Sequence, residues 1–182
     1  MKTLSSKYIS DHRYFKARVD SYELDSGKIV DPYYVVEMPS SVVAMAITEN
    51  NEVVLVKQYR HPVSQVLLEL PGGFIDENEQ PQLSISRELE EETGYSFKDF
   101  YYLGITSANP GVIDNFCHLF LAIGGRKTSV QKLDANEEIE IVLKPLDEVK
   151  LMLHHNEFLQ SQHALCLFYG FEKLELLRKS IL

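Results

Sequence analysis

One acidic segment enclosed by glycines constrains this chain more than any other feature. Four carboxylates lie within residues 88–92, after a Pro-Gly-Gly turn at residues 71–73 and before Gly94. Pro81 suits a first helical turn and Gly94 suits a helix end, so the segment favours one helix of about three turns. Like charges three or four positions apart destabilise an isolated helix by roughly 0.2–0.5 kcal/mol per pair. The helix therefore needs a compensating positive charge.

Three of these carboxylates share one helix face, because Glu88, Glu91 and Glu92 stand at positions i, i+3 and i+4. A solvated acidic face is one interpretation. A hard divalent cation bound by oxygen ligands is the other, since it would convert the repulsion into binding energy. Glu88 and Glu92, one turn apart, are the best candidate ligands. Glu91 is either a third ligand or an ion-pair partner of Arg87, and both roles stay open.

The spacing of residues 73–95 resembles the Nudix box, G-x5-E-x7-R-E-U-x-E-E-x-G-U, in which U is a bulky apolar residue. Its nine fixed positions are filled by Gly73, Glu79, Arg87, Glu88, Leu89, Glu91, Glu92, Gly94 and Tyr95. Tyr95 is less aliphatic than is usual there, but so many matches at fixed spacing make the signal specific. The chain is similar to a Nudix hydrolase. This resemblance implies an α/β/α sandwich, a mixed sheet between helices, and hydrolysis that depends on Mg²⁺, with Mn²⁺ as an alternative.

The resemblance also implies roles around the helix. In related enzymes the backbone carbonyl that matches Gly72 joins the metal ligands, while Glu79 and Arg87 brace the loop against the helix. Arg87 and Glu91 are accordingly candidate catalytic residues. Glu90 falls at a variable position and is interpreted as a solvated charge.

A second acidic cluster occupies residues 136–140. Alone it would be ordinary loop polarity. Beside the box it resembles the mobile acidic loop of ADP-ribose pyrophosphatases, which carries the general base and sometimes a metal ligand. We expect Glu138 to be the base and Glu140 an added ligand, although the two roles can be exchanged.

Three features resemble the ADP-ribose and nucleotide-sugar pyrophosphatase branch. They are residues 55–60 with 68–73, an N-terminal β unit, and Pro110, which lies where ADP-ribose hydrolases place a proline. The expected substrate is a nucleoside diphosphate sugar, with ADP-ribose first and AMP and ribose 5-phosphate as products. Related enzymes often carry an acidic residue near Asn115, and here only Asp114 is acidic, which weakens the claim to ADP-ribose in particular.

Candidate substrate contacts follow from the same comparison. Arg60 and Glu69 are candidates for gripping the substrate, although Arg60 also suits a subunit contact. Tyr14 and Phe15 are candidates for stacking on the base, although aromatic residues in a β unit are usually core or interface. Two alternatives remain: a hydrolase of nucleoside triphosphates or other nucleotides, and a sensor that binds a nucleotide sugar without cleaving it.

Residues 1–40 are expected to form an N-terminal antiparallel β unit, and residues 41–182 the catalytic domain. A hairpin at residues 15–24 and 28–36 is marginally stable alone and needs a surface to cover it. Enzymes of the branch are commonly dimers, so a homodimer is expected. Further strands are expected at residues 41–48, 52–59, 65–70, 99–106, 115–123 and 138–143, and helices at residues 146–155 and 161–180.

The chain has 182 residues, 45% of them hydrophobic, and a formal net charge of −9. The negative charge argues against non-specific binding to nucleic acid or to anionic membranes. No apolar stretch is long enough to span a bilayer, and the first residues lack a secretory signal. Cys117 and Cys166 stand in apolar surroundings and are expected to be free thiols, which predicts a cytoplasmic protein.

Overall fold

The computed structural model describes residues 1–12 and 15–179, which divide into two compact units. One unit combines Met1–Ser40 with Ser107–Phe116, and the other combines Ser41–Thr106 with Cys117–Leu182. The inclusion of Ser107–Phe116 differs from the expected division, in which this loop belonged to the catalytic domain. It joins the N-terminal unit because Val36 N–H donates to Val112 O at 2.7 Å.

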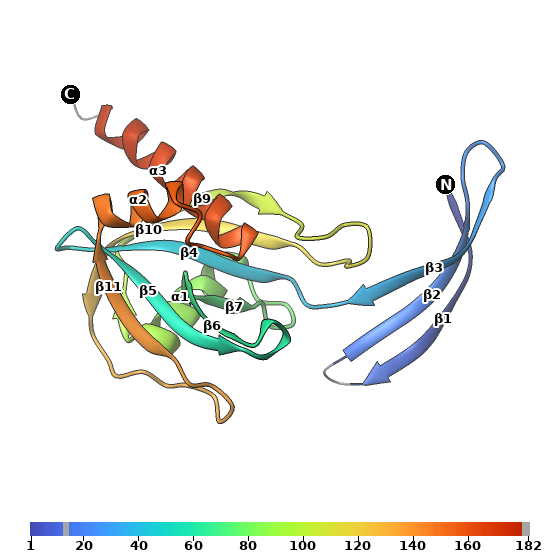
Figure 1. Ribbon diagram of the computed structural model, residues 1–182, viewed down its shortest axis with the longest axis horizontal. Helices are drawn as coiled ribbons and strands as arrows, with labels where there is room; N and C mark the ends of the chain where they lie inside the picture. The colour runs from blue at the N-terminus through green and yellow to red at the C-terminus, as the bar shows by residue number, and fades with distance from the viewer. Residues whose placement is uncertain (13–14, 180–182) are drawn as a thin grey trace. The chain divides into compact units, whose positions relative to one another are not determined.

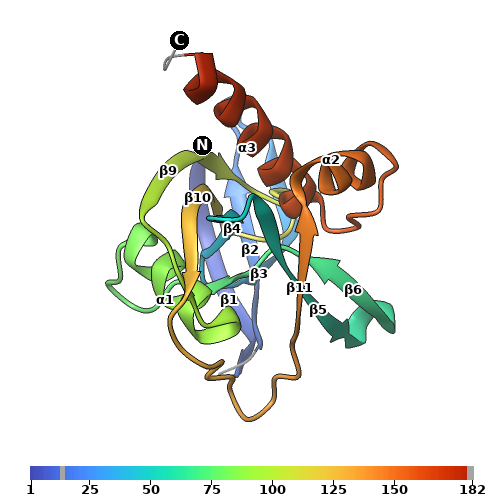
Figure 2. The same cartoon turned by 90° about the vertical axis from the view of Figure 1, so that its left-hand side faces the viewer.

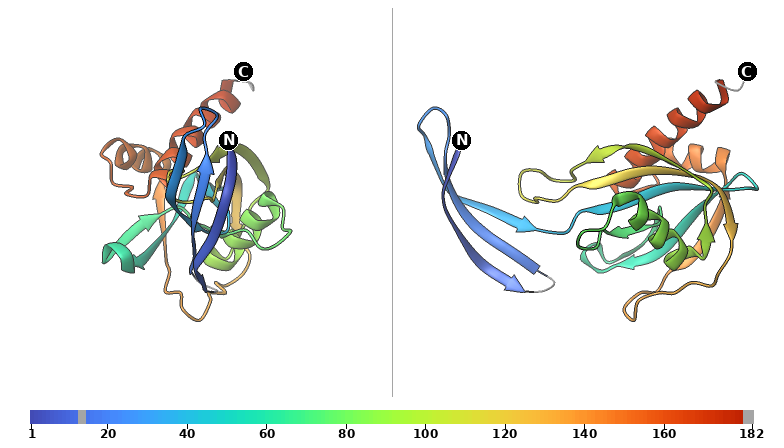
Figure 3. Two further views of the ribbon diagram at one scale, coloured as in Figure 1. Left: turned by 90° about the vertical axis from the view of Figure 1, so that its right-hand side faces the viewer. Right: turned by 180° about the vertical axis from the view of Figure 1, so that it is seen from behind.

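The N-terminal unit is an antiparallel sheet of three strands in the order β1-β2-β3 (Figure 3). The strands are β1 (Lys2–His12), β2 (Phe15–Glu23) and β3 (Ile29–Glu37). The expected hairpin is formed by β2 and β3. Strand β1 was not predicted, because its polar Lys- and Ser-rich sequence lacks the alternation of apolar residues that marks a half-buried strand.

The larger unit is built on a mixed sheet of eight strands. Five of them lie in the order β11-β5-β4-β10-β8, while β6 pairs with β5, β7 with β4 and β9 with β10. Its strands are β4 (Ser41–Thr48), β5 (Glu52–Arg60), β6 (Gln65–Glu69), β7 (Gly72–Phe74), β8 (Tyr95–Ser96), β9 (Asp99–Thr106), β10 (Cys117–Lys127) and β11 (Glu140–Pro145). β4 and β10 run parallel, and the other pairings are antiparallel.

Helix α1 (Pro81–Thr93) covers one face of this sheet, and α2 (Leu146–His154) and α3 (Ser161–Lys179) cover the other (Figures 1 and 2). The predicted α/β/α sandwich is therefore confirmed. A short 3-10 helix, η1 (His61–Val63), links β5 to β6. No helix in the described part of the chain is long and apolar enough to cross a membrane.

The alternation of β4 explains why its sequence is apolar without interruption. Val43 and Met45 pack with α2 and α3, whereas Val42 and Ala44 pack with Ile85 of α1. Because side chains alternate between faces, a strand covered on both sides needs apolar residues at every position. This rigid centre carries the Gly72 turn on one neighbour, β7, and α1 across its face.

Candidate active site

Helix α1 and the glycine turn are positioned by the same strand. β7 pairs with the start of β4, where Gly72 lies opposite Val43. A side chain at Gly72 would be impossible, because its Cβ would lie 2.1 Å from Val42 O. At the other end of α1, Gly94 adopts a left-handed conformation with φ of 70° and its N–H donates to Glu90 O.

Glu92 is a buried carboxylate aimed at the glycine turn. Gly72 N–H donates to Glu92 Oε2 at 2.9 Å, and the residue is 5% exposed. Burial, together with the charges of Glu88 and Glu137, raises the pKa of Glu92 to about 8 against the opposing effect of that hydrogen bond. The ionised form of Glu92 therefore lacks sufficient compensation within the metal-free site.

Glu88 lies against the second glycine of the turn. A Cβ atom on Gly73 would come within 2.5 Å of the Glu88 carboxylate, so only glycine leaves room for that group. Burial raises the pKa of Glu88, and the positive charge of Arg87 opposes the rise. The two helix carboxylates thus flank consecutive residues of one loop, Gly72 and Gly73.

Arg87 ties the loop to the helix. Its guanidinium contacts both oxygens of Glu79 at 3.1 and 2.9 Å, and donates to Glu88 at 2.8 Å and to Glu91 at 3.0 Å. It also donates to Phe74 O at 3.2 Å, and the Arg87 hydrogen bond lowers the pKa of Glu79 to about 2. Of the two roles left open for Glu91, the structure shows the ion pair with Arg87. A role as a metal ligand stays a prediction.

The oxygen donors at this site suit a hard divalent cation. Within residues 1–12 and 15–179 no three His, Cys, Asp or Glu side chains converge closely enough to form a metal site as they stand. Glu88 is turned onto Arg87, and Glu92 onto Gly72 N–H. Buried, undercompensated carboxylates beside a backbone loop form the kind of donor set that Mg²⁺ prefers, so these residues fit the ion.

One residue of the acidic loop that the sequence did not single out acts electrostatically on the helix carboxylates. The charge of Glu137 raises the pKa of both Glu88 and Glu92. Glu138, the residue expected to be the base, is exposed. The sequence signal for Glu137 was present in the cluster 136–140, but its orientation depends on how the loop folds.

Glu140 is not brought to the helix in this structure. It lies in register with Lys57, and its Oε2 is 3.5 Å from Lys57 Nζ. The next residue, Ile141, packs with the core beneath α1. Because strand side chains alternate, Glu140 points to the opposite face of the sheet.

Arg60 and Glu69, both predicted substrate contacts, form one ion pair with different exposures. The Arg60 side chain is 39% exposed, whereas that of Glu69 is 1% exposed, and their closest atoms are 2.6 Å apart. Gln58 and Gln160 also donate to Glu69, at 3.3 and 2.8 Å. Burial opposes a charged Arg60, but its hydrogen bonds to Glu69 and the negative charge of Glu92 raise its pKa. The partly exposed Arg60 is therefore accessible to a ligand, while the buried Glu69 fixes the orientation of the Arg60 guanidinium.

Helix α3 contributes residues that sequence reasoning missed. Leu70 N–H donates to His163 Nδ1 at 3.0 Å, and burial lowers the pKa of His163 to about 4. Gln160, just before α3, binds Glu69. These contacts join segments about ninety residues apart, so no local pattern could have indicated them.

The remaining predicted substrate residues belong to the N-terminal unit. Phe15 is 54% exposed. Pro110 lies in a turn in which Asn109 O accepts from Val112 N–H at 3.1 Å. Tyr14 lies outside the described residues.

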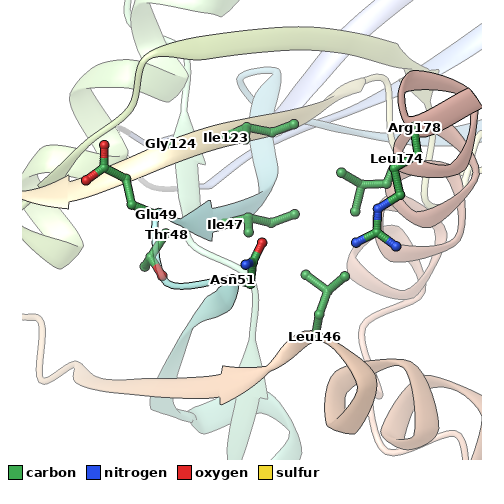
Figure 4. A pocket seen from close by; sticks show the side chains of 9 residues that line it. All are labelled: Ile47, Thr48, Glu49, Asn51, Ile123, Gly124, Leu146, Leu174 and Arg178. Atoms are coloured by element: carbon green, nitrogen blue, oxygen red, sulfur yellow. The ribbon is translucent and has the colours of Figure 1, made fainter. Parts of the chain in front are cut away.

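A separate hollow of about 200 Å³ lies at the other end of β4 (Figure 4). Ile47, Asn51 and Arg178 are among its lining residues. β7 pairs with residues 41–43, at the start of β4, so this hollow is not part of the acidic site.

Comparison with known proteins agrees with this geometry. The sequence profile of the NUDIX domain matches residues 38–163, and the chain belongs to the Nudix family. Fold and site together define a pyrophosphohydrolase. More specifically, residues 1–36 match the nucleoside diphosphate sugar hydrolase N-terminal domain.

Two bacterial relatives match over nearly their whole length. A methanol dehydrogenase activator from Bacillus methanolicus is 32% identical over 169 residues, which cover 92% of this chain and 91% of the relative. An ADP-ribose pyrophosphatase from Bacillus subtilis (strain 168) is 30% identical over 178 residues, covering 93% and 94%. The crystal structure of an ADP compounds hydrolase shares the fold, with a TM-score of 0.83 at 22% identity, covering 96% of this chain and 95% of that one.

Proposed function

We propose that this protein hydrolyses the diphosphate of a nucleoside diphosphate sugar, with ADP-ribose as the leading substrate and AMP and ribose 5-phosphate as products. The observation that carries the proposal is the pair Glu88 and Glu92, held against Gly72 and Gly73 in a complete Nudix box. The ADP-ribose pyrophosphatase of Bacillus subtilis and the N-terminal domain match support the substrate class.

Mg²⁺, with Mn²⁺ as an alternative, would be held by Glu88, Glu92 and the carbonyl of Gly72. When bound, the ion would neutralise phosphate charge and acidify a water. Arg87 keeps the helix and the loop in register. Arg60, oriented by Glu69, supplies positive charge for a phosphate oxygen.

The acidic loop supplies the general base. Glu138 is the residue expected from the sequence, and Glu137 is the one whose charge reaches Glu88 and Glu92. Comparing Glu137→Gln with Glu138→Gln separates them, because loss of the base costs about 10²–10⁴ in turnover. The assignment of Glu140 as an added ligand stays a prediction from the sequence.

The N-terminal unit supplies the remaining specificity. Phe15, Tyr14 and Pro110 are proposed to contact the base or sugar. The three-stranded sheet leaves large apolar residues exposed, including Tyr8, Ile9 and Tyr34. A second copy of the chain would cover them, which supports a homodimer. The two free, buried cysteines agree with a cytoplasmic location.

The deciding experiment is a panel of nucleotide sugars and nucleoside triphosphates incubated with Mg²⁺ or Mn²⁺, with products identified by mass. ADP-ribose should yield AMP and ribose 5-phosphate. Cleavage of triphosphates alone would replace the substrate class. Binding without any cleavage would favour a sensor, although the retained Glu88, Glu91 and Glu92 argue against that function.

A further inference from the structure

The C-terminal end of α1 is closed by residues 128–132, a segment far along the chain. Gly94 O accepts from two backbone N–H groups of this segment, at 2.9 and 3.1 Å, and Lys132 N–H donates to Glu91 O at 2.8 Å. The last carbonyls of a helix have no partner within the helix, so these contacts satisfy groups that would otherwise be orphaned.

Gln131, within the same segment, makes a different kind of contact. Its side-chain nitrogen donates to Glu92 O at 2.7 Å and to Ile139 O at 3.1 Å. A side-chain amide offers two N–H donors, and here each finds a carbonyl. Glu92 is the buried carboxylate of the site, and Ile139, 7% exposed, directly follows the exposed residues 134–138. The Gln131 side chain thus joins α1, the helix proposed to hold the metal, to the C-terminal end of the acidic loop.

Two hydrogen bonds run within the acidic loop, residues 134–138. Glu137 N–H donates to Asp134 O at 3.0 Å, and Asp134 N–H donates to Glu137 Oε2 at 3.0 Å. These bonds shape the turn but attach it to nothing else. The position of this loop relative to α1 therefore depends on how the ends of the loop are anchored.

We propose that Gln131 is a positioning residue that fixes the acidic loop against the C-terminal end of α1, so that the loop carboxylate reaches the reacting water. The inference rests on the proposed function. The neutral amide of Gln131 donates hydrogen bonds to two carbonyls at once, which neither a carboxylate nor an apolar side chain of the same length can do. Removing the Gln131 amide frees the loop, whereas the backbone hydrogen bonds of Gly94 and Lys132 remain at the end of α1.

The first test replaces Gln131 with Met, which keeps the length and removes both donors. The turnover number for ADP-ribose should fall at least about tenfold, because a displaced base loses most of its effect. KM and the Mg²⁺ concentration for half-activation should stay within about twofold. Gln82→Met, on the exposed side of the first turn of α1, is the matched control. A turnover number within twofold of the wild type overturns the inference.

A double-mutant cycle tests whether Gln131 acts through the loop. Gln131→Met is combined with Glu137→Gln and, separately, with Glu138→Gln. In the background of whichever glutamate is the base, Gln131→Met should cause little further loss, since the group it positions is already gone. Losses that multiply in full in both backgrounds overturn the inference.

Hydrogen exchange gives a readout that does not need activity. In Gln131→Met, the backbone amides of residues 133–138 should exchange faster, while those of residues 85–93 in α1 keep their protection. Faster exchange in α1 itself would make Gln131 a helix cap and overturn the positioning role. If the wild-type protein cleaves no diphosphate, the proposed function fails, and the exchange experiment still decides whether Gln131 holds the loop.

Discussion

At the scale of single residues, the site holds charges that would be more stable elsewhere. Glu92 is buried beside Glu88 and within reach of the charge of Glu137, and its hydrogen bond from Gly72 does not offset the loss of hydration. Burying a carboxylate without a full partner is unfavourable. A bound cation would compensate the charge of Glu92 and make its burial favourable. The stability of the metal-free protein and the activity with metal should therefore oppose each other at this position.

Glu92→Gln should reduce metal-dependent turnover at least about a hundredfold while stabilising the metal-free protein at alkaline pH. The pKa of Glu92 is about 8 in the folded protein against 4.5 in the reference state, so the folded protein binds more protons between these values. Wild-type stability should therefore fall relative to the variant as pH rises from 5 to 9. Thermal unfolding without metal and turnover with Mg²⁺ measure both effects.

The glutamine can still accept the hydrogen bond from Gly72, so the substitution isolates charge from shape. Glu90→Gln, on the same helix, is the control and should alter neither quantity. Turnover close to that of the wild type in Glu92→Gln would remove Glu92 from the metal site.

Gly73→Ala should weaken Mg²⁺ activation by about ten- to a hundredfold with little loss of stability. The new methyl group would occupy the space of the Glu88 carboxylate, 2.5 Å away, and that flexible side chain can move aside. The Mg²⁺ concentration for half-activation measures the effect, with Ser86→Ala, on the exposed side of α1, as the control. An unchanged Mg²⁺ requirement would mean that Glu88 does not hold the ion.

At the scale of elements, the start of α3 holds the strand that leads into the glycine turn. Leu70, directly after β6, donates to His163, and the preceding Glu69 binds Gln160. Pro71 and Gly72 follow at once. The helix on one face of the sheet thus helps to fix a loop that serves the other face.

Acid should loosen this contact. The pKa of His163 is about 4 in the folded protein against 6.5 in the reference state, so the unfolded chain binds more protons between these values and stability falls as pH falls. Nδ1 can accept from Leu70 only while it is unprotonated. Thermal unfolding from pH 7 to pH 5 should show a smaller loss for His163→Asn, which keeps an acceptor without the titration. The exposed His155→Asn should follow the wild type, and a wild-type decline in His163→Asn would contradict the argument.

The sequence predicted those elements whose signal is local. Helix α1 was predicted from Pro81 and Gly94, β4 from its strand pattern, and the brace role of Arg87 from the resemblance to the Nudix box. Contacts made by the fold were not predictable in this way. Gln131 and His163 carry no motif, and their partners lie in segments brought together by the sheet. Strand β1 was missed for a related reason, because a strand with exposed residues on both faces has no apolar alternation.

At the scale of the whole molecule, the two units differ in how they bury apolar surface. In the larger unit the sheet is covered on both faces, whereas in the N-terminal sheet large apolar residues such as Ile9 and Ile29 are 59% and 58% exposed. Contiguous exposed apolar surface marks an interaction site more often than an ordinary monomer surface. The net charge of −9 makes a polyanionic partner unfavourable. A second copy of the chain is the partner that the family resemblance and this surface both favour.

Light scattering during size-exclusion chromatography should therefore give about twice the chain mass of 20.9 kDa at micromolar concentration. Ile9→Lys should weaken association at least about tenfold, because burying an ammonium group in an apolar contact is costly. Lys7→Ala, in the same exposed strand, is the control for a general loss of charge or fold. If the site needs the partner, dilution below the dissociation constant should lower the specific activity of the wild type in parallel with its mass. A mass of 20.9 kDa at every concentration would assign the apolar sheet to something other than a second copy.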